Sequence, residues 1–293
     1  MIHKEKVAIS AKGLRYSYQE GSVALDGVDF EIKCGEFIAL LASNGSGKTT
    51  LLKALVGLLK PQKGNIKING VSIGKMKMRE ISRIIGFVLQ NPNDQLFAAT
   101  VEDDVAYGPQ NLGLPEDEVE SRVAEALGLV AATHLRKKAI HHISYGEQKR
   151  VAIAGVLAMR PDILILDEPT AGLDPAGETA MMKLLNDLNH KHDITVILAT
   201  HSVDMLPVFA DRIYVMKDGV VLRSGEPYDI FSDQELIKNA NLRLPYISSL
   251  LYEMQHIDGV PIGDLPLTIR EARTRLLELL PDDIIASRIK KGL

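Results

Sequence analysis

The sequence predicts an α/β fold with a core parallel sheet, an N-terminal antiparallel β layer, an inserted α-helical subdomain and a C-terminal helical extension. The core sheet is predicted from four near-continuous apolar runs, at residues 37–41, 84–89, 163–166 and 195–199. Such runs, separated by helical stretches, are typical of a parallel sheet covered on both faces. Residues 91–159 lack strand signals and show charged helical patterns instead, notably from Glu116 to Leu129. The helical insertion therefore interrupts the sheet.

The segments that precede residue 71 predict the antiparallel layer. Residues 6–10 and 13–18 look like short strands, and residues 28–32 alternate as a half-exposed strand should. Residues 65–70 alternate in the same way after a turn at residues 61–64.

The C-terminal part begins with a predicted hairpin at residues 213–224, centred on Lys217-Asp218-Gly219. Beyond about residue 230 the pattern is helical and is divided by prolines. We therefore expect a main domain at residues 1–230, with its helical subdomain at about 91–160, and an extension at residues 231–293. The sequence leaves open whether this extension braces a dimer, regulates activity or only packs as helices.

Composition narrows the class of protein. The chain has 293 residues, 46% of them hydrophobic and 25% charged, which is ordinary for a globular protein. Its net charge of −4 argues against a general nucleic-acid binder, which would be basic. A single cysteine, Cys34, excludes an internal disulfide framework and suits a reducing cytoplasm. No apolar run is as long as a membrane span, and we expect an intracellular chain without a membrane segment of its own.

The most informative stretch runs from Ala42 to Thr50, between the apolar run at 37–41 and a helical pattern at 51–56. Its glycines let successive backbone N–H groups point inward at a positive helix end, which forms an anion nest. Lys48 would reach the β- and γ-phosphates of a nucleotide, and the Thr49 hydroxyl would bind Mg²⁺. The predicted nucleotide-binding residues here are Ser43, Asn44, Gly45, Ser46, Gly47, Lys48, Thr49 and Thr50.

The same stretch departs from the usual P-loop pattern at its first position. Ala42 stands where glycine is usual. A methyl group is tolerated there if φ stays negative, and otherwise crowds the loop. With the strand before it and the helix after it, the stretch still predicts the core of a P-loop NTPase.

Asp167 and Glu168 follow an apolar strand directly. Both carboxylates therefore lie at its carboxyl end, where ligands bind in open α/β sheets. Asp167 is predicted to hold Mg²⁺, as the acidic partner of a phosphate loop does. Glu168 is predicted to orient or deprotonate a water that attacks the γ-phosphate. A carboxylate beside the metal favours water over another phosphoryl acceptor.

Taken together, these motifs resemble those of an ABC-transporter ATP-binding subunit over roughly residues 5–225. Asp167-Glu168-Pro169-Thr170 matches the Walker B segment, and residues 171–174 match the D-loop. The resemblance implies that Gln90 is the Q-loop residue that contacts Mg²⁺ or water. It implies that His201 is the switch histidine and that Tyr18 stacks on adenine, with Tyr16 as the less favoured neighbour. The implied cofactors are ATP and Mg²⁺.

Residues 143–150 occupy the place of the family's signature, Leu-Ser-Gly-Gly-Gln. Ser144 and Gly146 are retained, while Tyr145 replaces a glycine and Glu147 replaces the glutamine. In this family the signature completes the nucleotide site of the opposite subunit, which assigns Ser144, Gly146 and Glu147 to the partner's ATP. The resemblance therefore implies a dimer, with an identical or a related chain. Glu147 adds negative charge near the γ-phosphate, which weakens closure unless its carboxylate faces a cation.

Within the family, the segments at residues 91–97, 151–157 and 241–245 resemble the energy-coupling-factor group, and most of all its cobalt- or nickel-transport ATP-binding subunits. This implies an integral membrane coupling protein and a membrane substrate-binding component as partners, with the chain at the cytoplasmic face of the cell membrane. Leu96 and Phe97 are candidate anchors for a helix of the coupling protein, although a buried pair is equally expected for Leu96.

Other interpretations remain open from the sequence. One is a vitamin-importing energy-coupling-factor complex, and another is a nucleotide-dependent structural partner with little turnover. A third is a non-transport ABC ATPase acting on nucleic acid or ribosomes, but tandem cassettes, long coiled coils and zinc cysteines are absent, and no nucleic acid is expected. His134, His141 and His142 suggest a metal site only weakly, since no acidic partners or fixed spacing accompany them, and a solvated loop is favoured.

Overall fold

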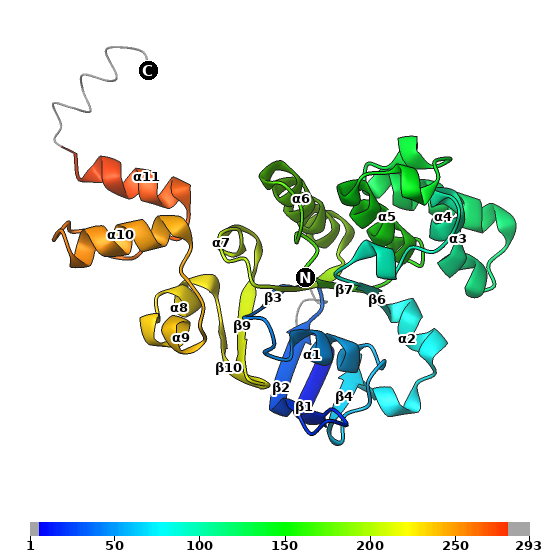
Figure 1. Cartoon of the computed structure of the whole chain (residues 1–293), viewed down its shortest axis with the longest axis horizontal. Helices are drawn as coiled ribbons and strands as arrows, with labels where there is room; N and C mark the ends of the chain where they lie inside the picture. The colour runs from blue at the N-terminus through cyan, green and yellow to red at the C-terminus, as the bar shows by residue number, and fades with distance from the viewer. Residues whose placement is uncertain (1–5, 281–293) are drawn as a thin grey trace, which may run out of the picture.

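The computed structural model describes residues 6–280 and contains two sheets (Figure 1). The smaller sheet is entirely antiparallel, as predicted, in the order β2-β1-β4-β5. Its strands are β1 (Val7–Ser17), β2 (Val23–Lys33), β4 (Lys63–Ile68) and the two-residue β5 (Val71–Ser72).

The two short strands expected at residues 6–10 and 13–18 are one strand, β1. Its pairing with β2 shifts register between Ala11 and Leu14, where Gly13 has φ +60°. A bulge of this kind interrupts the apolar alternation without ending the strand. The sequence pattern therefore looked like two strands.

The larger sheet has six strands in the order β10-β9-β3-β8-β7-β6. They are β3 (Phe37–Ala42), β6 (Ile85–Val88), β7 (Ile163–Asp167), β8 (Thr195–Thr200), β9 (Arg212–Lys217) and β10 (Val220–Gly225). The first five are parallel, and β10 returns antiparallel to β9 as the predicted hairpin. Every residue of β3, β7 and β8 is buried, which is why their sequences read as continuous apolar runs.

Helices cover both faces of this sheet. The helix α1 (Lys48–Leu55) lies between the two sheets, where Leu51 and Leu52 share a core with β1, β2 and one face of β3. The helix α6 (Pro175–His192) packs on the other face through residues such as Leu185. The strand that precedes the phosphate loop, β3, lies inside this sheet, between β9 and β8.

The predicted insertion is helical between β6 and β7, and Figure 1 shows its helices grouped at one end of the large sheet. Its elements are α3 (Val101–Asn111), α4 (Glu116–Leu129), α5 (Tyr145–Leu157) and the 3-10 turns η3 (Pro92–Asp94), η4 (Thr133–Leu135) and η5 (Ile140–His142). The helix expected at 116–129 is confirmed. Before β6, η2 (Ile73–Lys75) and α2 (Met78–Ile84) connect the two sheets.

The C-terminal segment is helical, as expected, and lies at the other end of the sheet, beside β9 and β10 (Figure 1). It contains α8 (Pro227–Phe231), α9 (Gln234–Asn239), α10 (Tyr246–His256) and α11 (Ile269–Glu278), and α7 (Leu206–Phe209) precedes β9. The proposed boundary at residue 230 falls within α8, and residues 281–293 of the proposed extension lie outside the described residues. Within residues 6–280, no helix combines the length and apolar character needed to cross a bilayer.

Candidate active site

The loop between β3 and α1 curls in the way the glycine pattern predicted. Gly45 has φ +79° and Gly47 has φ +94°, conformations that other residues rarely adopt. A Cβ at Gly47 would also lie 2.2 Å from the Ala24 carbonyl oxygen. Gly47 is the N-cap of α1 and offers no side chain to its N–H groups, which leaves those donors for an anion.

The serines of this loop stabilise its shape. Ser46 is buried, and its hydroxyl hydrogen-bonds to the Ser43 hydroxyl at 2.9 Å and to the Ser43 carbonyl at 2.8 Å. The Gly219 N–H, at the tip of the β9–β10 hairpin, donates to the Ser46 carbonyl at 3.0 Å. Asn44 is exposed at the rim of the loop.

Ala42, the departure from the usual pattern, is the last residue of β3 rather than part of the turn. It is fully buried, pairs with Met216 of β9, and does not have a positive φ. Because a strand position accepts any L-residue, the Ala42 methyl does not strain the loop.

Lys48 opens α1 and is buried. Its Nζ donates to the carbonyl oxygens of Ala42 at 2.7 Å and Ser43 at 3.1 Å. The same Nζ lies 3.6 Å from Oε1 of Glu168. The ammonium therefore stands between the loop and the predicted catalytic carboxylate.

Thr49 and Asp167 are brought together from α1 and β7. The Thr49 hydroxyl donates to Oδ2 of Asp167 at 2.6 Å. Burial raises the pKa of Asp167, the Thr49 hydrogen bond opposes that shift, and the neighbouring Glu168 adds to it. A hydroxyl and a buried carboxylate are the oxygen ligands Mg²⁺ takes, and a cation would stabilise this charge. The pair therefore fits the predicted metal site.

Glu168 lies at the centre of the cluster. It is buried, and it has a φ of +47°, a left-handed conformation that is uncommon for a residue other than glycine. Nδ1 of His201, which follows β8, lies within hydrogen-bonding distance of Glu168 Oε1, at 2.9 Å. Strained residues held by their surroundings are frequent at active sites.

Gln90, the predicted Q-loop residue, lies close to the site through its backbone. It is exposed in the loop after β6, and no hydrogen bond among the described residues joins its side chain to Thr49 or Asp167. Its carbonyl oxygen instead accepts a hydrogen bond from Nζ of Lys149 at 3.1 Å.

Lys149 is a residue of this cluster to which the sequence interpretation gave no role. It lies on α5, is buried, and donates both to the Gln90 carbonyl and, at 3.1 Å, to the Glu168 carbonyl. Burial lowers its pKa to about 8, against the opposing effect of Glu168. Lys149 therefore links the loop of Gln90 to the backbone of Glu168. A lysine two positions after Glu147, on a helix otherwise rich in apolar residues, was the available signal.

Comparison with known proteins identifies the family of this chain. A family model described as ABC transporter matches residues 25–171. The energy-coupling factor transporter ATP-binding protein EcfA of Methanocaldococcus jannaschii is 47% identical over 276 residues, covering 94% of this chain and 98% of the relative. The EcfA2 protein of Clostridium perfringens is 45% identical, covering 92% and 95%. The chain belongs to the ABC transporter ATP-binding family.

Solved structures extend the agreement to the fold. The cbiO1 protein of Clostridium perfringens, described as part of the ABC transporter complex cbiONQ, has a TM-score of 0.74 and 44% identity, covering 84% of this chain and 99% of that one. A dimeric ATP-binding cassette, MJ0796, bound to ADP and Pi, has a TM-score of 0.68 and 30% identity, covering 75% and 98%. The chain is thus an ATP-binding and ATP-hydrolysing subunit of an energy-coupling-factor type ABC transporter.

In this ABC cassette, Tyr18 lies just after β1, and its hydroxyl shares a hydrogen bond of 2.9 Å with the Thr50 hydroxyl. The rings of Tyr16 and Tyr18 contact each other edge to face, with centroids 5.1 Å apart. Tyr18 is exposed beside the first turn of α1, an arrangement that suits the adenine-stacking role predicted for it.

The signature segment of the cassette begins α5. Ser144 is the N-cap, and Oε2 of Glu147 accepts from the Ser144 N–H at 2.7 Å and from its hydroxyl at 2.8 Å. The Ser144 N–H, and then the Ser144 hydroxyl, lower the pKa of Glu147. Among the described residues, no hydrogen bond or ion pair joins Ser144, Gly146 or Glu147 to the phosphate loop of the same chain.

Two side-chain contacts involve residues of the signature segment. Tyr145, which replaces a glycine, packs against Gly172 of the D-loop, where a Cβ would lie 3.0 Å from the ring. Nε2 of His134 lies 3.8 Å from Oε1 of Glu147, so the carboxylate does face a group that can be a cation.

His141 and His142 contact each other edge to face. Among residues 6–280, no group of three or more His, Cys, Asp or Glu is arranged to hold a metal ion.

Proposed function

We propose that this chain powers an energy-coupling-factor importer of cobalt or nickel ions by hydrolysing ATP between two cassettes. The observation that carries the catalytic part is the convergence of Lys48, Thr49, Asp167 and His201 around Glu168 at the carboxyl edge of the large sheet. The proposed cargo rests on the sequence resemblance described above. In this family the cargo contacts other polypeptides rather than the ATP-binding subunit.

Each residue of the site has one proposed role. The N–H groups of the loop from Ser43 to Gly47 and the Lys48 ammonium bind the phosphates, and Tyr18 stacks on the base. Thr49 and Asp167 would hold Mg²⁺, with Gln90 completing the set once its side chain turns inward. Mg²⁺ supplies positive charge that offsets the charge developing on the phosphate oxygens.

Glu168 is the proposed general base. It accepts a proton from the attacking water as the new bond to the γ-phosphorus forms and the bond to the bridging oxygen breaks, which yields ADP and phosphate. His201, within hydrogen-bonding distance of the same carboxylate, orients it. Lys149 fixes the Glu168 peptide through its carbonyl oxygen.

The second half of each ATP site is proposed to come from a partner cassette, identical or related. Ser144, Gly146 and Glu147 make no described contact with their own phosphate loop, which supports a role toward another chain's ATP. The N-terminal end of α5 would then face that γ-phosphate.

A groove between α2, α3 and α5 is the proposed contact with the membrane coupling protein. It has a volume of about 470 Å³ and is lined by residues that include Met78, Phe97, Tyr107 and Met159. Phe97 is 64% exposed and packs edge to face on Tyr107, with centroids 4.6 Å apart. Leu96, by contrast, is only 8% exposed and belongs to the core, so Phe97 alone keeps the role of anchor. An apolar helix at the cytoplasmic face of the membrane fits this groove.

The groove is tested by Phe97→Glu in cells that contain the membrane components. We expect this variant to lose co-purification with the membrane fraction. Val208→Glu is the matched control, since Val208 is 61% exposed and lies on α7, outside the groove. Equal retention of both variants would contradict the proposed docking surface. Co-purification with RNA or DNA instead would favour a non-transport ABC ATPase.

The cargo is tested on the intact complex. The chain is expressed with its membrane partners, reconstituted into vesicles, and assayed for ATP-driven uptake of radioactive cobalt or nickel ions and of vitamins. We expect metal uptake, and uptake of a vitamin alone would replace the metal proposal by the vitamin-importing alternative.

A further inference from the structure

The loop that carries His201 is tied directly to the start of the C-terminal extension. Asp204 lies three residues after His201, in the connection from β8 to α7. Its Oδ1 accepts from the Tyr246 N–H at 2.9 Å and from Nη1 of Arg243 at 3.1 Å. Nη2 of Arg243 donates to Oδ2 of Asp204, which makes the pair bidentate.

The helix α10 depends on this contact because it lacks a cap of its own. Its N-cap residue is Pro245, which has no side-chain acceptor, and its first turn contains no acidic residue. The first N–H groups of a helix need an acceptor, and negative charge is stabilising there. Asp204, in the loop that follows His201, supplies both the acceptor and the negative charge.

Arg243 holds the joint together from the other side. Its guanidinium lies over the Tyr246 ring, 4.0 Å from the centroid, while both of its terminal nitrogens bind Asp204. Asp204 therefore contacts both a charged side chain and a helix terminus of the extension.

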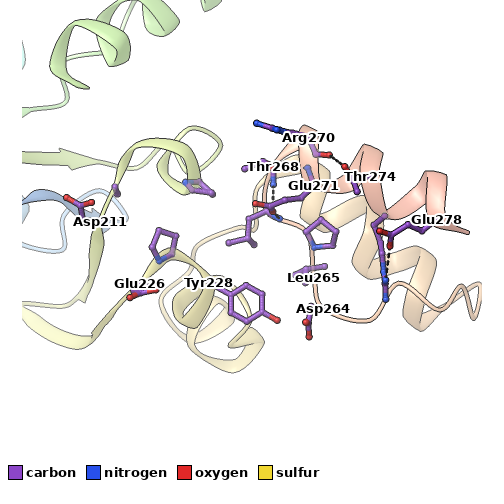
Figure 2. A pocket seen from close by; sticks show the side chains of 16 residues that line it. Asp211, Glu226, Tyr228, Asp264, Leu265, Thr268, Arg270, Glu271, Thr274 and Glu278 are labelled. Atoms are coloured by element: carbon purple, nitrogen blue, oxygen red, sulfur yellow. Dashed lines mark hydrogen bonds and ion pairs between the residues drawn. The ribbon is translucent and has the colours of Figure 1, made fainter. Parts of the chain in front are cut away.

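On another side of this joint the extension and the cassette are separated by a crevice of about 1060 Å³, shown in Figure 2. Glu226 and Tyr228 line it from the α8 end, and Thr268, Glu271 and Thr274 line it from the α11 end. Apolar packing of Leu244 and Leu267 against the main core completes the contact. Asp204 lies outside this crevice and joins the start of the extension directly to the loop that follows His201.

We propose that Asp204 and Arg243 are positioning residues, through which the C-terminal extension sets the place of the loop that presents His201 to Glu168. This inference rests on the proposed roles of Glu168 and His201. It assigns to the extension a regulatory role, one of the alternatives that the sequence left open.

The test compares Arg243→Gln with Arg223→Gln in the assembled transporter. The pair Arg223–Asp233 is a matched control, since it joins β10 to the N-cap of α9 with side-chain exposures of 47% and 31%, against 42% and 34% for Arg243–Asp204. We expect Arg243→Gln to lower kcat by roughly 3- to 30-fold, the range for residues that modulate a site without touching the reactants, with KM for ATP unchanged. Arg223→Gln should leave kcat within about twofold of the parent.

If Arg243 only stabilises the fold, both variants should have a lower melting temperature, and Arg243→Gln should not show a lower kcat at an unchanged KM for ATP. Equal kcat for the two variants, or a loss of Arg243→Gln activity matched by lost ATP affinity, would overturn the inference. Asp204→Asn provides a second check, because asparagine can still accept from the Tyr246 N–H but loses the ion pair, and we expect an intermediate kcat. Glu168→Gln is measured in parallel to distinguish failure of the proposed mechanism from failure of this inference. Full turnover by Glu168→Gln would contradict the proposed mechanism. If Glu168→Gln is slow but Arg243→Gln has the kcat of the parent, only the proposed coupling between the extension and the His201 loop is rejected.

Discussion

His201 Nδ1 lies 2.9 Å from Oε1 of Glu168, and the two residues come from the ends of neighbouring parallel strands, β8 and β7. The Lys48 ammonium approaches the same oxygen at 3.6 Å. A single carboxylate oxygen therefore has one neighbour at the start of α1, after the phosphate loop, and one in the loop that follows β8. This arrangement gives the proposed general base, Glu168, neighbours from two different loops, and the predictions below test that role.

Glu168→Gln is expected to bind ATP, to hydrolyse it about 10²- to 10⁴-fold more slowly, and to accumulate as a two-cassette dimer, because the amide keeps the shape but cannot accept the proton. Phosphate release and size-exclusion chromatography with ATP measure these outcomes. Glu116→Gln, on the exposed start of α4, is the charge-matched control. Full turnover by Glu168→Gln would remove Glu168 from the mechanism.

Lys48→Ala is expected to abolish tight ATP binding, since the Lys48 ammonium is the positive charge that the phosphate loop itself presents. Equilibrium binding of a fluorescent ATP analogue measures the change. Lys60→Ala removes an exposed lysine after α1 and should bind as the parent does. Unchanged affinity of Lys48→Ala would refute its role in the site.

Much of the fold was predictable from the sequence because the buried parallel strands are almost purely apolar. The run at 163–166, for example, coincides with β7, and the carboxylates that follow it lie at the sheet edge as expected. What local patterns did not resolve was the bulge at Gly13, where one strand looks like two. The two-residue strand β5 is too short to leave a pattern at all.

The site was less completely predictable, for a different reason. Lys149 contacts the carbonyl oxygens of Gln90 and Glu168, which are 59 and 19 residues away in the chain. Every residue has a backbone carbonyl group, so the type of residue does not indicate which carbonyl will accept a hydrogen bond. No sequence motif therefore predicts these two contacts. Leu96 and Phe97 are adjacent and both apolar, yet Leu96 is buried and Phe97 is exposed, a difference that residue type alone does not predict.

Ala42→Gly is expected to leave ATP turnover unchanged and to lower the free energy of unfolding by about 0.5–1 kcal/mol, the usual cost of glycine within regular structure. The reason is that Ala42 is a buried residue of β3 rather than part of the turn. Urea unfolding and phosphate release together measure both effects. A large rise in turnover would mean that the methyl group hinders the loop after all.

Glu147→Gln is expected to promote ATP-driven dimerisation. Glutamine can still cap α5 through Ser144, since either residue serves in a capping box, but it removes a negative charge from the end of α5 proposed to face the partner's phosphate. Measured in a Glu168→Gln background, the ATP concentration for half-maximal dimer should fall roughly 2- to 5-fold, the effect of a partly exposed charge. Glu253→Gln, on α10, is the control, and a rise in the required ATP would contradict the proposed position of Glu147.

The Asp204–Arg243 pair predicts a pH dependence of stability. Burial alone would raise the pKa of Asp204, but the hydrogen bonds from Arg243 and the Tyr246 N–H lower it below its ordinary value. A carboxylate whose pKa is lower in the folded state stabilises the fold above its unfolded pKa, and this contribution is lost as the pH falls through the folded pKa. Because both side chains are partly exposed, we expect Arg243→Gln to cost about 0.5–1 kcal/mol near pH 7. The difference from the parent should shrink below about pH 4, near the ordinary pKa of aspartate, in urea titrations of both proteins. If the difference in free energy of unfolding stays constant down to the lowest pH at which both proteins fold, Arg243 acts through packing on Tyr246 rather than through its charge.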